Sequence, residues 1–192
     1  LSLLPLAQEC TLMLAGSRRY LSAESLLANG SLLADGARLL LVPQPAVTIE
    51  RCLQTLTSAD DGAERTGCVG QLRTLLSDAQ LAEEFVAQDG ISLLLTLAHD
   101  ERVVGGGGEL GAATLVALRQ ALRFQAALDQ LADSEEHSML LCRLLYSASD
   151  MVASRALELL ILVCGAASKP DVHQRILAAA TASACELDEP PL

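Results

Sequence analysis

Aromatic side chains are almost absent from this sequence. Phe and Tyr occur twice each and Trp does not occur among 192 residues, although 51% of the residues are hydrophobic. The interior must therefore be built from aliphatic side chains and alanine, a composition that favours closely packed helices. A chain of this length buries roughly 70% of its unfolded surface, which is enough for a sizeable core.

Basic residues are also scarce. The sequence has 13 Lys and Arg against 24 Asp and Glu, which gives a formal net charge of −11 at pH 7. Nucleic-acid affinity comes largely from neutralised phosphates, so nucleic acid is not an expected partner. The same acidity argues against binding to an anionic membrane surface.

Long apolar runs are missing as well. A membrane-spanning helix needs about 20 apolar residues, whereas the run "LLILVC" covers only 159–164. We therefore expect no integral membrane segment. Residues 1–6 are apolar but have no basic region before them and no small-residue cleavage site after them, so no signal peptide is expected.

No C-x-x-C pair occurs among the cysteines. Several of them lie among apolar residues at helical spacing, which predicts reduced core thiols in a cytoplasmic protein; disulfides or a metal site are the alternatives. The six residues are Cys10, Cys52, Cys68, Cys142, Cys164 and Cys185.

No motif for catalysis or cofactor binding is present. His99, His137 and His173 are far apart, and none has a His or Cys three or four residues away, so no metal site is expected. The run "GGGG" at 105–108 continues without the Gly-Lys-Ser/Thr of a phosphate-binding loop and predicts a surface loop. Cys164 has apolar neighbours, which favours a buried thiol over a nucleophile. We expect a protein that is not an enzyme, with no cofactor and no metal.

Residues 1–43 predict a partial ubiquitin-like module. Strands are expected at 11–16, 18–22 and 38–42, the last of them buried, with turn signals at Asn29-Gly30 and Asp35-Gly36. This order matches the second half of a ubiquitin-like fold, with residues 1–10 ending its helix and the first hairpin missing. An irregular leader with one hairpin is the alternative.

The periodicity becomes helical after the prolines of "VPQPA" (42–46). We expect a linker at 44–47 and a helical domain over 48–192, with seven or eight helices that form an armadillo-like α-solenoid. Helix starts are expected at Ser77-Asp78, at 133–136, at Asp150 and at 168–171, and one long helix is expected over 110–132. Asp89-Gly90 is expected to end a helix with the glycine in the left-handed conformation. Ala126 is expected to face inward. Segments 77–98 and 147–164 are a loose internal repeat.

The segment "LAEEFVAQDGISLLLTL" at 81–97 resembles the engulfment and cell motility (ELMO) family, in which a helix ending in Glu-Phe-Ile precedes Asp-Gly-Ile-Ser-Leu-Leu. Residues 1–42 and 110–164 align more faintly with the Ras-binding ubiquitin-like domain and the later armadillo helices of that family. The segment "SASDMVASRALELLILVCGAAS" at 147–168 is similar to the N-terminal regulatory region of diaphanous-type and FHOD-type formins, which has the same layout.

Both resemblances imply a non-catalytic regulator in small-GTPase signalling to the actin cytoskeleton. The implied partners are a GTP-bound small GTPase of the Ras superfamily and a guanine-nucleotide exchange factor or another large protein. Arg18, Arg19 and Arg38 are the basic residues of the first module, and they are either GTPase contacts or solvated strand ends. A further alternative is a structural subunit of a large assembly, such as a ciliary complex.

Overall fold

A computed structural model of the chain describes residues 10–14, 19–21, 38–59, 61–99, 108–166, 169 and 171–188. The chain divides into two compact units, residues 1–48 and residues 49–192.

The first unit contains a three-stranded antiparallel sheet. Its strands are β1 (Cys10–Leu14), β2 (Arg19–Leu21) and β3 (Leu39–Pro43), in the order β2-β1-β3. All three predicted strands are therefore present, within a few residues of their expected bounds. The prediction that the last strand is buried is wrong, because Leu40 and Leu41 are 46% and 69% exposed. Among the described residues β3 lies at the edge of the sheet, with β1 as its one hydrogen-bonded neighbour.

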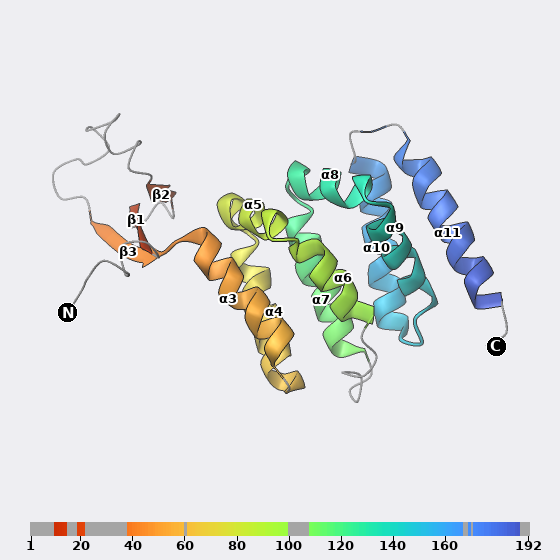
Figure 1. Cartoon of the computed structure of the whole chain (residues 1–192), viewed down its shortest axis with the longest axis horizontal. Helices are drawn as coiled ribbons and strands as arrows, with labels where there is room; N and C mark the ends of the chain where they lie inside the picture. The colour runs from red at the N-terminus through yellow and green to blue at the C-terminus, as the bar shows by residue number, and fades with distance from the viewer. Residues whose placement is uncertain are drawn as a thin grey trace. The chain divides into compact units, whose positions relative to one another are not determined.

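Helices account for nearly all of the described residues of the second unit (Figure 1). The described residues form nine α-helices and one 3-10 helix, against seven or eight expected. They are α3 (Pro45–Ser58), α4 (Gly62–Leu75), α5 (Ala79–Ala87), α6 (Gly90–His99), α7 (Glu109–Ala121), α8 (Gln125–Asp133), α9 (Glu135–Arg143), η3 (Leu144–Tyr146), α10 (Asp150–Ala166) and α11 (Val172–Asp188). Helix α3 begins inside the segment predicted as a linker, because a proline is well tolerated in the first turn of a helix.

A group of three helices occurs twice in succession. A short helix, α5 or α8, is followed by the pair α6 and α7 or the pair α9 and α10 (Figure 1). Helix α8 begins 46 residues after α5, at Gln125 against Ala79. Corresponding helices touch, since α5 contacts α8, α6 contacts α9 and α7 contacts α10. The structural repeat therefore differs from the one expected from the sequence, which aligned the α5–α6 segment with α10.

The long helix expected over 110–132 is interrupted. Helix α7 ends at Ala121, and Phe124 has extended backbone angles (φ −102°, ψ 134°) before α8 begins. No glycine, proline or side-chain cap marks this break, and the Phe124 side chain makes no capping hydrogen bond. The prediction that Ala126 faces inward is wrong for the same reason, because the residue lies on the exposed side of the new helix.

Polar caps begin several helices as the sequence predicts. The Asp78 carboxylate accepts hydrogen bonds from the backbone N–H groups of Gln80 and Leu81, and the Ser134 hydroxyl accepts one from His137. Each cap satisfies backbone donors that have no partner within the helix. Helix α10 begins at Asp150, as expected.

Aliphatic side chains and alanine fill the core between these helices. The largest fully buried side chains include a single aromatic residue, Phe85, and the leucines and isoleucines that accompany it come from α3 to α8. Gly108, in the run expected to be a surface loop, is buried beside Ser149 with φ +83°. Residues 105–107 of that run lie outside the described part of the chain.

Candidate functional site

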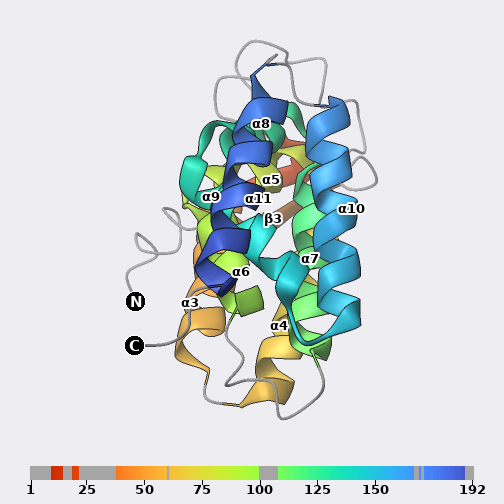
Figure 2. The same cartoon turned by 90° about the vertical axis from the view of Figure 1, so that its right-hand side faces the viewer.

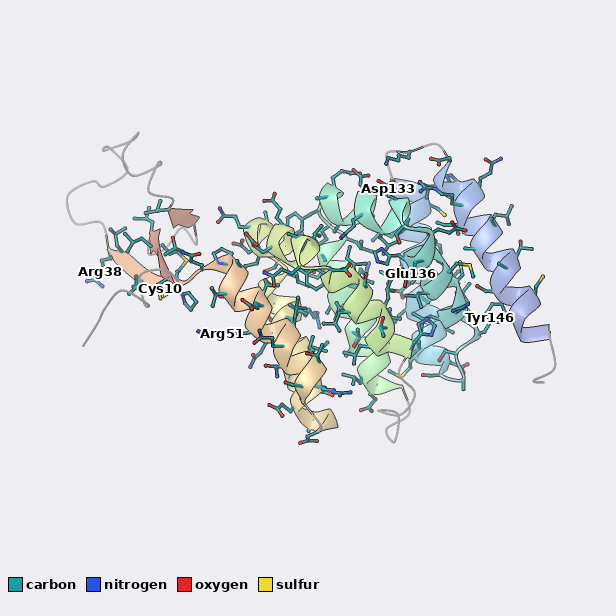
Figure 3. All side chains as sticks on the ribbon, in the orientation of Figure 1. Cys10, Arg38, Arg51, Asp133, Glu136 and Tyr146 are labelled. Atoms are coloured by element: carbon teal, nitrogen blue, oxygen red, sulfur yellow. The ribbon has the colours of Figure 1, made fainter. Side chains whose placement is uncertain are left out.

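The structure places two of the three predicted GTPase-contact residues at one end of the sheet. Arg19 is the first residue of β2 and is paired in register with Leu14, which is also paired with Leu39 at the start of β3. Arg38 immediately precedes that residue and is exposed, and its side chain extends away from the strand (Figure 3). Two strand spacings separate the backbones of β2 and β3, about 10 Å. Arg18 lies outside the described residues.

The outer face of α10 carries exposed apolar side chains in the second unit. Leu157 and Ile161 are one helical turn apart and are 51% and 64% exposed, and the exposed residues Ser154 and Gly165 continue the same face. We call these four residues the α10 strip. In the view of Figure 2, α10 and α11 are the helices nearest the viewer.

The opposite face of α10 is buried in the core. Val152, Ala156, Leu159, Leu160 and Val163 are all buried, and the helix packs against α7. When a helix is apolar on more than one side, the apolar side chains that its neighbouring helices do not cover remain exposed. The unbroken apolar run at 159–164 is the sequence signal for this exposure, because one buried face of a helix does not need six consecutive apolar residues.

Two of the three histidines join α6 to α9. Nε2 of His99 donates a hydrogen bond to the Leu140 carbonyl at 2.7 Å, since a carbonyl oxygen can only accept. Nε2 of His137 lies 2.6 Å from the Ser92 hydroxyl. His173 is exposed on α11. Both contacts are partly buried and link equivalent helices of the two three-helix groups.

Asp89, Ser92 and His137 form a short hydrogen-bonded chain. The Ser92 hydroxyl donates to Oδ1 of Asp89 at 2.6 Å, so its oxygen accepts from Nε2 of His137. A catalytic serine needs the reverse arrangement, in which the histidine accepts the serine proton and a carboxylate orients the other ring nitrogen. Here Nδ1 of His137 is buried and has no hydrogen-bond partner among the described residues. These hydrogen bonds therefore hold the corner between α5 and α6 against α9, and they do not activate the serine.

A pocket opens between α3 and α4. It has a volume of about 330 Å³ and is lined by Arg51, Cys52, Thr55, Glu64, Gly67, Cys68 and Gln71. The Cys68 thiol donates to the Cys52 carbonyl oxygen at 3.4 Å. Burial raises the pKa of Cys52, and burial together with the neighbouring Cys52 raises the pKa of Cys68 to about 11.

The six cysteines are all free thiols. Cys68 and Cys142 are buried, Cys10, Cys52 and Cys164 are half-buried, and Cys185 is exposed. Burial raises the pKa of both Cys142 and Cys164. Within the part of the chain that the structure describes, no three His, Cys, Asp or Glu side chains are grouped so that they could hold a metal ion.

None of the described helices is both long enough and apolar enough to cross a membrane. The Cys52–Cys68 contact and the α10 strip are the two features that were not predicted from the sequence.

In comparison with known proteins, no family model and no curated protein matches this chain.

Proposed function

We propose that the chain is a non-catalytic scaffold and that its second unit is an armadillo-like α-solenoid. The succession of two three-helix groups, α5 to α7 and then α8 to α10, supports this proposal, as do the contacts between equivalent helices. A repeat of about 40 to 47 residues is typical of armadillo units. In such arrays each repeat buries its apolar face against the next, and the outer faces remain available for partner proteins.

The observation that carries the binding proposal is the exposed α10 strip. Its two large side chains have the one-turn spacing with which a helix receives the apolar face of a second helix. Because the chain has a net charge of −11, the occupant that fits best is an amphipathic helix of a partner protein with basic residues on its flanks.

We further propose that the partner system is small-GTPase signalling to the actin cytoskeleton, in the manner of the ELMO family. The resemblance of residues 81–97 to that family supports this proposal. The partial ubiquitin-like reading of the first unit is supported by its strand order, in which the central β1 lies between β2 and β3. The proposed GTPase contacts are Arg18, Arg19 and Arg38, and the proposed location is the cytoplasm.

The formin-like regulatory region remains the main alternative, because segment 147–168 resembles it and has the same domain layout. A formin-like chain would regulate actin nucleation, whereas an ELMO-like chain would act beside an exchange factor. A spacer subunit of a large assembly would present the same α10 strip but would not distinguish GTP-bound from GDP-bound partners.

Substitution on the α10 strip tests the scaffold directly. We expect that Leu157→Asp together with Ile161→Asp removes partners that the immobilised wild-type chain retains from a cell extract, as identified by mass spectrometry. Leu177→Asp is a matched control, since Leu177 is 67% exposed on α11. An identical set of retained proteins in all three samples would exclude the strip as a binding surface.

A further inference from the structure

Cys52 and Cys68 belong to different helices but are in contact. The Cys68 thiol donates a hydrogen bond to the Cys52 carbonyl oxygen at 3.4 Å, and both cysteines line the same pocket. The two residues are 16 positions apart, at the middle of α3 and the middle of α4. Two rigid helices therefore hold a pair of thiols together within the second unit.

The pair is open to small molecules through the pocket between α3 and α4. The pocket of about 330 Å³ has both cysteines in its lining, together with the charged side chains of Arg51 and Glu64. Gly67, next to the buried thiol, leaves space, because a Cβ at that position would meet nothing within 4 Å. Cys52, which is half-buried, is therefore the cysteine that a small reagent in the pocket meets first.

We propose that Cys52 and Cys68 form a dithiol site that reacts with a small disulfide, such as oxidised glutathione, and closes to an intramolecular disulfide between α3 and α4. The site is separate from the α10 strip and from the proposed GTPase contacts. Its chemical partner is a disulfide of low molecular mass, and its product is a chain in which two neighbouring helices are covalently linked.

The reaction proceeds in two exchange steps. First, the Cys52 thiol loses its proton to solvent and its sulfur attacks one sulfur of the small disulfide, which forms a mixed disulfide and releases one small thiolate. Second, the deprotonated Cys68 sulfur attacks the Cys52 sulfur, forms the internal disulfide and releases the second small thiolate. Both released thiolates take up a proton, so the small disulfide is reduced to two thiols and the protein dithiol is oxidised.

The environment of each thiol fixes this order. Cys52 is half-buried, whereas Cys68 is only 7% exposed and is the less accessible of the two. Burial raises the pKa of both thiols; the Cys68 side chain partly offsets this effect for Cys52, whereas the Cys52 side chain adds to it for Cys68. Cys52 is therefore the attacking residue, and Cys68 is the residue that resolves the mixed disulfide.

Trypsin mapping of the full chain tests the proposal. Cleavage after Arg51, Arg65 and Arg73 places the two cysteines in separate peptides, 52–65 and 66–73, each with one cysteine. After incubation with oxidised glutathione, we expect these two peptides linked to each other, in a chain about 2 Da lighter for the two hydrogen atoms lost. The rate should rise by about tenfold per pH unit from pH 7, because only thiolates react and both thiols are largely protonated there.

Single-cysteine variants test the order of the two steps. The Cys68→Ser variant should accumulate glutathione on Cys52, whereas the Cys52→Ser variant should leave Cys68 unmodified. Cys185 is an internal control, because it is exposed and lies in a separate tryptic peptide, 176–192. Circular dichroism of each variant establishes that its helices are retained.

Two results would overturn the proposal. One is the absence of the 52–65 to 66–73 link at pH 9 in a sample whose Cys185 has taken up glutathione. The other is a link of Cys52 to any cysteine except Cys68 in the monomeric chain. The presence of the link, with the expected behaviour of both variants, would support the dithiol site.

Discussion

The ring of Phe85 lies directly over Gly90, at the corner between α5 and α6. A Cβ built at position 90 would be 2.1 Å from Cε2 of that ring, far closer than van der Waals contact allows. The left-handed residue of the corner is Asp89, with φ +56°, rather than the glycine. Gly90 is therefore required for close approach of the ring, and a short polar residue supplies the turn.

We predict that Gly90→Ala destabilises the protein by about 1–3 kcal/mol, because the added methyl group must displace a fully buried ring. The measurement is the free energy of unfolding from urea titration. In a Phe85→Leu background the same glycine substitution should cost less, because the ring that clashes is gone.

Gly70→Ala is the matched control for this substitution. Gly70 is exposed inside α4 and a Cβ there would meet nothing within 4 Å. The substitution should stabilise the helix by about 0.5–1 kcal/mol, because alanine loses less backbone entropy on folding. Equal effects at both glycines would show that the ring contact does not determine the residue at position 90.

The hydrogen bond between Ser92 and His137 should contribute measurably to stability. Ser92→Ala leaves the buried Nε2–H of His137 without its acceptor, which costs about 1–3 kcal/mol. The same substitution in a His137→Leu background should cost less, with a coupling energy of about 0.5–3 kcal/mol between the two sites. Additive losses in this double-mutant cycle would mean that the hydrogen bond does not form in solution.

Truncation of a leucine should have a small effect on stability on the exposed face of α10 and a large effect on its buried face. Leu157→Ala on the exposed strip should change the free energy of unfolding by no more than about 0.5 kcal/mol. Leu159→Ala, which removes a side chain that is 1% exposed, should cost about 2–5 kcal/mol. A large loss for Leu157→Ala in the isolated chain would show that this face is already covered.

Stability should fall at alkaline pH through Cys68. Its pKa is about 11 in the folded chain against an ordinary value of 9.0, so the folded state holds this proton more tightly than the unfolded state does. The stabilising contribution is complete below pH 9 and is lost as the pH rises from 9 towards 11. Urea midpoints of the reduced protein measured across this window should fall less steeply for Cys68→Ala, and identical slopes would contradict the assignment.

Local chemistry made part of the fold predictable from the sequence. The caps at Asp78 and Ser134 use side chains that bond their own helix starts, and such bonds depend on only a few neighbouring residues. The three strands were predicted because short apolar runs separated by turn signals indicate strands without any knowledge of distant contacts. The starts of α5, α9 and α10 and the positions of the strands were therefore predicted within a few residues.

Other features depend on contacts between distant segments and were missed. The break at Phe124 has no capping side chain and no glycine, so its position is set by the packing of α8 on α5. The interaction of Cys52 with Cys68 requires the angle between two helices, which no residue spacing reveals. Likewise, the exposed side of α10 depends on which neighbours cover the rest of that helix.

The most direct test of the proposed GTPase-linked scaffold is the affinity of the purified chain for Ras-superfamily GTPases in both nucleotide states. We predict that at least one GTPase binds in its GTP-bound form and much more weakly with GDP. Arg18→Glu with Arg19→Glu, and separately Arg38→Glu, should reduce that affinity, whereas Arg73→Glu on the exposed surface of α4 should not. Absence of binding to every GTPase in the panel, or equal affinity for the GTP and GDP forms, would contradict the proposal.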